Sequence, residues 1–315
     1  MARSPEELRA QLAGLFAFPV TPFTHENQVD FPRYRENLQF LIDAQPAALF
    51  VCCGTGEFFS LDLAEYQALV KAGVEEAFGK LPVLAGVGYG ARLAIEFAKA
   101  AEKAGADGLL VMPPYLIRAA QEGLYQHYRS IAASINIGVI VYQRDNAIFA
   151  PATVRRLAEI PNVVGFKDGH GDMERLLRIG LAVGERLAFM NGMPTAELSA
   201  RAFRGVGVSS YSSAVFNFVP EIARAFYCSL TEQDEVRLNR LMEGFYEPLA
   251  ELRDRVPGYA ISLIKAGLKI MGRPSGGTRP PLIDPPAEHE QELKWIIRRG
   301  LSLVRSFAGQ DHPSN

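Results

Sequence analysis

Eight short apolar runs alternate with amphipathic stretches along the chain, and this alternation limits the possible folds more than any other feature of the sequence. Strands that alternate with helices are joined by crossovers, so neighbouring strands run parallel. Eight such units predict an α/β fold, a TIM (β/α)8 barrel, with an open doubly wound sheet as the alternative. Helical patterns lie at 61–78, 91–104, 122–134, 151–159 and 172–184, among others. The predicted strands are 15–23, 48–53, 83–87, 108–112, 138–142, 163–167, 187–191 and 206–210.

The strand signal stops at Pro220, and the rest of the chain has a helical pattern. A stretch rich in Gly and Pro at 273–286 predicts a loop. We therefore expect the barrel over residues 1–220, a C-terminal helical extension over 221–308, and a disordered tail at 309–315. The predicted helices of the extension are 221–230, 232–252, 259–271 and 288–306.

Charge and cysteine content narrow the class of partner. The net charge is −2 and both signs are well mixed, so we expect neither nucleic acid nor a membrane surface as a partner. No run of about 18 apolar residues is present to span a membrane, and the N-terminus lacks the apolar core of a signal peptide. Three cysteines are too few for a disulfide framework, which predicts a cytoplasmic protein.

Lys167 ends the apolar run at 163–167. The chain has eight lysines, and the other seven fall in helical patterns or, for Lys80, in a loop. Apolar surroundings lower the pKa of an amine, and a neutral amine can add to a carbonyl and form a Schiff base. A lysine that simply reaches solvent from the strand end is the alternative.

Polar residues follow several of the other predicted strands, where the catalytic groups of a TIM barrel lie. Gly54 and Thr55 follow the second strand, and their N–H groups and hydroxyl can hold a carboxylate. Tyr142 ends the fifth strand and can relay protons to a nearby lysine. Arg144, two residues later, can clamp a carboxylate with two hydrogen bonds.

Four further residues are candidates for substrate binding. Tyr115 follows the fourth predicted strand and Gly192 the seventh, and Ser209 and Ser210 end the eighth. Clustered hydroxyls suit a ligand with several hydroxyl and carboxyl groups. Tight turns, a serine-rich turn and tyrosines whose hydroxyls simply face water are the structural alternatives.

The sequence predicts neither a cofactor nor a metal. The pattern Gly-x-Gly-x-x-Ala at 86–91 follows a strand, but the next strand does not end in the acidic residue that a dinucleotide ribose needs. Asp168, His170 and Asp172 are of metal-ligand type. The other histidines are scattered and none follows a strand, so this segment is interpreted as a polar loop.

Five segments together carry a family resemblance. They are Phe-Pro-Val-Thr-Pro-Phe at 18–23, Gly-Thr-Gly-Glu at 54–57, Gln-Glu-Gly-Leu-Tyr-Gln-His at 121–127, Tyr142, and Val-Gly-Phe-Lys at 164–167. With these segments nearly the whole chain resembles the dihydrodipicolinate synthase and N-acetylneuraminate lyase superfamily of Schiff-base lyases. The resemblance implies that Lys167 forms the Schiff base, Tyr142 relays protons, and Gly54 and Thr55 bind the substrate carboxylate.

The same resemblance implies a homo-oligomer, a dimer or a tetramer, because members often lend a tyrosine to a neighbouring subunit. That tyrosine falls on Tyr115. Within the superfamily, residues 54–61, 142–147 and 211–218 resemble the 5-dehydro-4-deoxyglucarate dehydratase family, which usually has Gly at the position of Cys53 and Asn at that of Gln143.

This second resemblance implies a substrate and a reaction. The small-molecule substrate is a keto sugar acid, 5-dehydro-4-deoxyglucarate, which is dehydrated and decarboxylated to 2,5-dioxopentanoate. Arg144 or the 209–213 cluster is expected to position the distal carboxylate. The alternatives are an aldolase-type lyase or synthase that acts on pyruvate and an aldehyde, a non-catalytic sugar-acid binding protein, and a metal-dependent aldolase.

Overall fold

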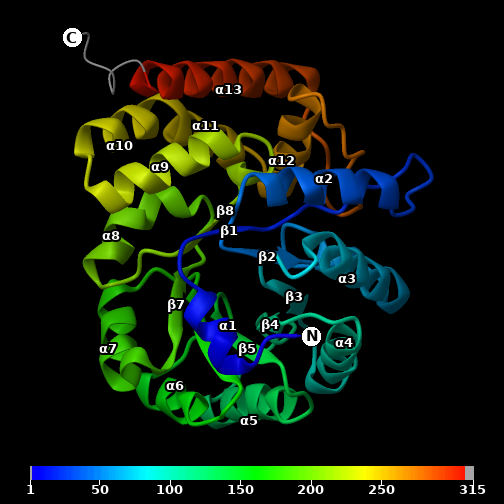
Figure 1. The fold of residues 1–315 in the computed structure, drawn as a ribbon, viewed down its shortest axis with the longest axis vertical. Helices are drawn as coiled ribbons and strands as arrows, with labels where there is room; N and C mark the ends of the chain where they lie inside the picture. Colours follow the sequence, from blue (N-terminus) through cyan, green and yellow to red (C-terminus); the bar gives the residue numbers. More distant parts are fainter. Residues whose placement is uncertain (1, 309–315) are drawn as a thin grey trace.

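Eight parallel strands form a closed barrel in the computed structural model, which describes residues 2–308 (Figure 1). Each strand pairs with the next one in the chain, and β8 pairs with β1 to close the ring. The predicted TIM barrel is confirmed, and the open sheet is excluded. The strands are β1 (Leu15–Ala17), β2 (Ala48–Val51), β3 (Val83–Val87), β4 (Gly108–Val111), β5 (Gly138–Gln143), β6 (Val163–Asp168), β7 (Ala188–Asn191) and β8 (Tyr211–Ser213).

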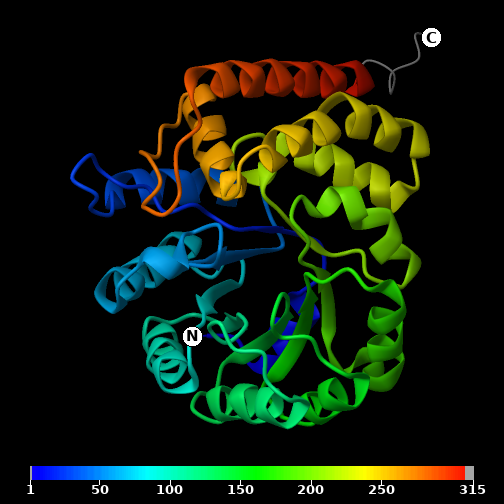
Figure 2. The ribbon, with the colours of Figure 1, turned by 180° about the vertical axis from the view of Figure 1, so that it is seen from behind.

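Helices follow the strands and cover the outside of the barrel (Figures 1 and 2). They bury one apolar stripe each; in α4, for example, Ala94, Phe97, Ala98 and Ala101 are buried at helical spacing. These helices are α2 (Phe31–Asp43), α3 (Leu63–Ala77), α4 (Ala91–Lys103), α5 (Gln121–Ala132), α6 (Pro151–Ala158), α7 (Met173–Val183) and α8 (Ala200–Gly205). Short 3-10 turns are η1 (Phe58–Ser60), η2 (Gly184–Arg186), η3 (Ala196–Ser199) and η4 (Val215–Asn217).

The C-terminal third is helical and packs along one side of the barrel, with α13 outermost (Figure 2). The elements are α9 (Pro220–Glu232), α10 (Glu235–Leu241), the π-helical turn η5 (Met242–Tyr246), α11 (Glu247–Asp254), α12 (Tyr259–Ile270) and α13 (Ala287–Ala308). The predicted helices and the loop at 273–286 are therefore present. Because α9 follows β8 as each earlier helix follows its strand, the domain boundary after residue 220 stays a prediction. The predicted tail at 309–315 lies outside the described residues.

The eighth strand is not where the sequence pattern predicts it. Residues 206–210 form the turn that ends α8, and the strand begins only at Tyr211. Gly207 has a φ of 87°, and the N–H groups of Gly207 and Val208 donate to the carbonyls of Arg204 and Phe203. This is a Schellman motif, in which a left-handed glycine closes a helix. Val206 and Val208 therefore alternate as in a strand, but the left-handed Gly207 between them prevents a strand from forming.

The first strand is shorter than predicted. It ends at Ala17 rather than at residue 23, because Pro19 and Pro22 cannot donate to a strand ladder. The second ends at Val51, since Cys52 takes a left-handed φ of 50°.

The N-terminal helix α1 (Pro5–Gln11) closes the end of the barrel at which the strands begin (Figure 1). Its Leu8 is completely buried and joins the cluster of side chains inside the barrel. A Cβ atom added to Gly108 or Gly138, at the starts of β4 and β5, would lie 2.6 Å from Leu8 Cδ2. The interior therefore opens only at the carboxyl ends of the strands. No helix within residues 2–308 is long and apolar enough to cross a membrane.

Candidate active site

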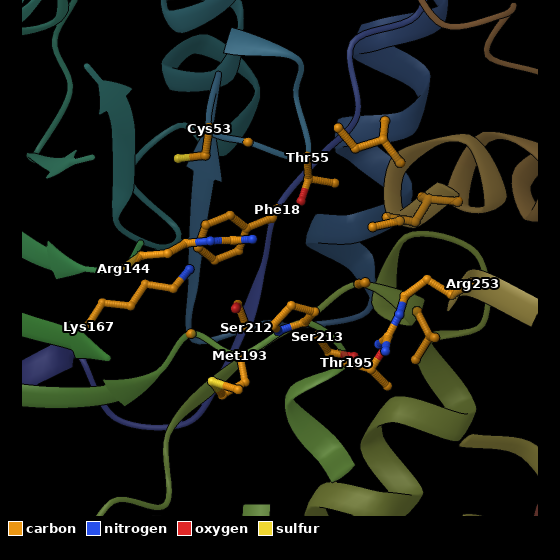
Figure 3. Close-up of a pocket in the computed structure, with 18 of the residues that line it drawn as sticks. Phe18, Cys53, Thr55, Arg144, Lys167, Met193, Thr195, Ser212, Ser213 and Arg253 are labelled. Atoms are coloured by element: carbon orange, nitrogen blue, oxygen red, sulfur yellow. The ribbon is translucent and has the colours of Figure 1, made fainter. Parts of the chain in front are cut away.

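A cavity of about 410 Å³ lies at the carboxyl ends of the strands (Figure 3). Six of the predicted site residues line it together, and they come from β2, β5, β6 and β7 or the loops that follow. Residues from the C-terminal helices α11 and α12 line it as well. The six are Gly54, Thr55, Tyr142, Arg144, Lys167 and Gly192.

Lys167 is buried at this cavity, with 4% of its surface exposed. Its Nζ atom lies 4.0 Å from the ring centre of Phe18 and 4.7 Å from that of Tyr142. Burial, assisted by the positive charge of Arg144, lowers the pKa of the amine to about 7. A large share of Lys167 is therefore a neutral nucleophile near pH 7.

A β-bulge in β6 turns Lys167 toward the inside of the barrel. The pairing of β5 with β6 skips one residue, so that Val164 is an extra residue on β6. Val164 belongs to the cluster inside the barrel, whereas Phe166 packs in the core between the strands and the helices. Side chains two residues apart normally share one face of a strand. The bulge shifts this alternation by one residue. Phe166 therefore faces outward, and the next residue, Lys167, faces the inside of the barrel.

Tyr142 lies beside Lys167 and is held from two sides. Its hydroxyl donates to the carbonyl of Gly192 at 2.9 Å and accepts from Arg144 Nη1 at 3.4 Å. Burial raises the pKa of the hydroxyl, so it stays protonated near pH 7. A Cβ atom on Gly192 would lie 2.6 Å from Lys167 Cε and 2.8 Å from Tyr142 Cε2. The missing side chain of Gly192 is therefore what lets the lysine and the tyrosine lie together.

The loop with Gly54 and Thr55 is anchored to the C-terminal helices through Glu57. Glu57 is fully buried and has a left-handed φ of 55°. Its carboxylate lies 2.7 Å from Lys265 Nζ of α12 and accepts from the backbone N–H of Arg279 at 3.0 Å. Part of the extension thus holds the geometry of a loop that follows β2.

The structure places three predicted binding residues outside the cavity. Tyr115 is 66% exposed on the loop after β4. Ser209 and Ser210 precede β8 rather than end it, and Ser210 Oγ accepts from the N–H of Gly14 at the opposite end of the barrel. The prediction that Ser209 and Ser210 lie at the carboxyl end of β8 is wrong, because the strand begins after them.

The lining differs from the sequence prediction around β8 and η3. Of the 209–213 cluster, Ser212 and Ser213 line the cavity, whereas the individually predicted Ser209 and Ser210 do not. Glu197, in η3, is buried against the cavity, and Ser213 Oγ donates to its Oε1 at 2.6 Å. Burial raises the pKa of Glu197 to about 7. The observed start of β8 at Tyr211 explains why the last two serines of the cluster reach the cavity, and no local pattern marks Glu197.

The acidic segment after β6 has a structural role. Asp168 is buried, accepts from Gln143 Nε2 at 2.6 Å and accepts from the N–H of Gly171 at 2.9 Å. Gln143 Oε1 in turn accepts from the N–H of Phe149 at 2.8 Å. The two side chains tie β5, β6 and the following loops together. Within residues 2–308 no group of three or more His, Cys, Asp or Glu side chains is placed to hold a metal ion.

The fold and the site define a class of protein, a (β/α)8 barrel whose carboxyl ends surround a buried amine. The model of the dihydrodipicolinate synthetase family matches residues 11–299, so the chain belongs to that family. A crystal structure of dihydrodipicolinate synthase from Oceanobacillus iheyensis superposes with a TM-score of 0.88 at 25% identity, covering 95% of this chain and all of the other.

Relatives with higher sequence identity indicate which group within the family this chain resembles. A probable 5-dehydro-4-deoxyglucarate dehydratase from Streptomyces griseus is 50% identical over 302 residues, 94% of each chain. One from Bradyrhizobium diazoefficiens is 48% identical, over 96% of this chain and 97% of that protein. The resemblance to the dehydratase family is therefore confirmed.

Proposed function

We propose that Lys167 forms a Schiff base with the ketone of 5-dehydro-4-deoxyglucarate. The observation that carries this proposal is the buried amine, 4.0 Å from the Phe18 ring and with its pKa lowered to about 7. Such an amine is neutral at the pH where it must attack. The names of the curated relatives support the choice of substrate.

The reaction is a dehydration followed by a decarboxylation. Lys167 adds to the ketone and water leaves, which gives an iminium. The iminium acidifies the neighbouring CH2 group, and loss of that proton gives an enamine that expels the β-hydroxyl as water. The resulting conjugated iminium accepts the electron pair released when the distal carboxylate leaves as CO2. Protonation and hydrolysis then free 2,5-dioxopentanoate and return the amine of Lys167.

The neighbours of Lys167 have distinct roles. Tyr142 relays protons during formation of the iminium, because its protonated hydroxyl lies beside the amine. Gly54 and Thr55 hold the carboxylate next to the ketone. Arg144 stabilises negative charge at the same end, where it also bonds the Tyr142 hydroxyl.

The protein works in the cytoplasm as a homo-oligomer, without a metal or a cofactor. The exposed Tyr115, Leu116 and Ile117 after β4 support contact with a second subunit, since neighbouring large apolar side chains are rarely left in water. Size-exclusion chromatography with light scattering tests the assembly, and a monomer at micromolar concentration would contradict it.

A product assay tests the reaction. Purified protein with 5-dehydro-4-deoxyglucarate should release CO2 and 2,5-dioxopentanoate in equal amounts, with no additive and after prolonged EDTA treatment. Pyruvate as the product would indicate an aldolase-type lyase on the same lysine. Activity lost to EDTA and restored by Zn²⁺ or Mg²⁺ would indicate a metal-dependent enzyme. Binding without turnover would leave a sugar-acid binding protein.

A further inference from the structure

We propose that Arg253 and Thr195 bind the distal carboxylate of the substrate, the one that leaves as CO2. The proposal rests on the proposed function, because only a dicarboxylate needs a second anion-binding group. It gives the C-terminal helices a direct part in the choice of substrate.

The distribution of positive charge around the cavity points to Arg253. Among residues 2–308, the cations that line it are Lys167, Arg144 and Arg253. Arg144 lies at the Schiff-base end, since it bonds the Tyr142 hydroxyl and depresses the pKa of Lys167. Arg253 enters from α11 on the opposite side, next to Thr195 (Figure 3).

Arg253 is held in place and still has capacity to bind. Its Nε and Nη2 atoms donate to the two carboxylate oxygens of Asp254 at 2.7 Å and 2.9 Å, and its Nη1 donates to Thr195 Oγ1. A guanidinium has five N–H groups, so these three bonds leave two for a ligand. Its side chain is 16% exposed, so the fork is ordered before the substrate arrives.

Thr195 has an unfavourable backbone conformation. Its φ of 47° is left-handed, which is a clear outlier for a β-branched residue. Such strain persists only where the surroundings fix it, and it concentrates at ligand-binding sites. The bond from Arg253 holds the hydroxyl of Thr195 at the cavity, where it can donate its own proton to a carboxylate oxygen.

The other side chains at the Arg253 end of the cavity suit a carboxylate that leaves as neutral CO2. Leu249, Ile261 and Ile264 line the cavity here and lower the local dielectric, which strengthens a charge-assisted hydrogen bond. The acidic neighbour Glu197 is largely protonated below about pH 7 and then does not repel the substrate. Asp254 shares the charge of Arg253, so the carboxylate is held without being overstabilised before CO2 leaves.

A comparison of arginine variants tests the proposal. Arg253→Gln should raise KM for 5-dehydro-4-deoxyglucarate by about 10–100-fold, with a smaller change in kcat. Arg253→Lys keeps the charge but loses the fork, and should give an intermediate KM. Arg255→Gln is the matched control at the C-cap of the same helix, because Arg255 bonds Glu292 outside the cavity. Its KM should stay at the wild-type value.

Pyruvate separates this proposal from the proposed function. Pyruvate has no distal carboxylate, so borohydride should trap it on Lys167 equally well in wild type and in Arg253→Gln, which also controls for folding. Two results would overturn the role of Arg253 and leave the proposed function standing. One is an unchanged KM in Arg253→Gln, and the other is a loss of pyruvate trapping as large as the loss of affinity for the dicarboxylate. A wild-type protein that traps pyruvate but does not turn over the dicarboxylate would overturn the proposed substrate and this inference together.

Discussion

Two lysines are buried within residues 2–308, and they differ in what lies around the amine. Lys265 of α12 lies 2.7 Å from the Glu57 carboxylate and donates to the carbonyl of Gly277 at 2.7 Å. Lys167 faces the rings of Phe18 and Tyr142 instead. Burial lowers the pKa of both amines, but Glu57 opposes the shift at Lys265.

No carboxylate opposes the shift at Lys167, where burial is opposed only by Cys53. The adjacent Cys53 thiol has its pKa raised to about 12 by burial and carries no charge at neutral pH. Arg144 adds a positive charge that disfavours the ammonium form. A carboxylate therefore makes one buried lysine a structural cation, and its absence leaves the other as an amine that is able to act as a nucleophile. Burial by itself does not distinguish the two.

The largest expected effect is the loss of all turnover in Lys167→Ala. Lys167 supplies the amine that the Schiff base needs, because its pKa is lowered to about 7 and it lines the cavity. Borohydride with substrate should add the reduced adduct to the Lys167 peptide of the wild type, as mass spectrometry would detect. The peptide that carries Lys265 should stay unmodified. An adduct on Lys265, with Lys167→Ala still active, would reverse the comparison.

Tyr142→Phe should fold normally and lose about 10²–10⁴-fold in kcat, the usual contribution of a general acid–base group. Steady-state kinetics measures the loss. Tyr66→Phe is the matched control, because Tyr66 is fully buried, does not line the cavity, and its hydroxyl has no hydrogen-bond partner within the described residues. Near wild-type turnover in Tyr142→Phe would reduce this side chain to packing against Lys167.

Lys265→Met should destabilise the fold by about 3–5 kcal/mol, because it leaves the buried charge of Glu57 without a partner. Chemical denaturation measures the free energy of unfolding. The double variant Glu57→Gln/Lys265→Met removes both charges and should recover most of that loss. A loss below about 1 kcal/mol in the single variant would show that the pair contributes no more than an exposed one does.

The smallest effect is on the pH profile. The pKa of Lys167 is lowered from 10.5 to about 7, so the neutral fraction of its amine rises through a midpoint near pH 7 and levels off above it. We expect kcat/KM to follow the same curve, since it reports the free enzyme. Glu197 also has a pKa near 7, and Glu197→Gln separates the two. The rising limb should remain in this variant, and its disappearance would assign it to Glu197.

Local patterns determined the barrel and its reactive end. Each strand is a short apolar run between helices, and a closed barrel brings the carboxyl ends of all its strands to one face. Lys167, Tyr142, Gly54 and Thr55 therefore lie around one cavity because of where each stands relative to its own strand. No long-range contact needs to be known for that inference.

Some errors arise because a single backbone angle overrides a pattern. Val206 and Val208 alternate as in a strand, but the left-handed Gly207 between them ends a helix. That angle moved the expected serines to the far end of the barrel and brought Ser212 and Ser213 to the cavity. The bulge at Val164, which directs Lys167 inward, leaves no mark in the sequence either.

Tertiary structure alone decided which distant residues complete the site. The Glu57 carboxylate meets Lys265 and the N–H of Arg279, 222 residues further along the chain. Arg253 reaches Thr195 from a helix outside the strand alternation. Sequence periodicity indicates which face of an element is apolar, but it does not indicate which element will cover that face. The sequence therefore predicts Lys167 as the nucleophile, whereas packing of the C-terminal helices decides which side chains line the other end of the cavity.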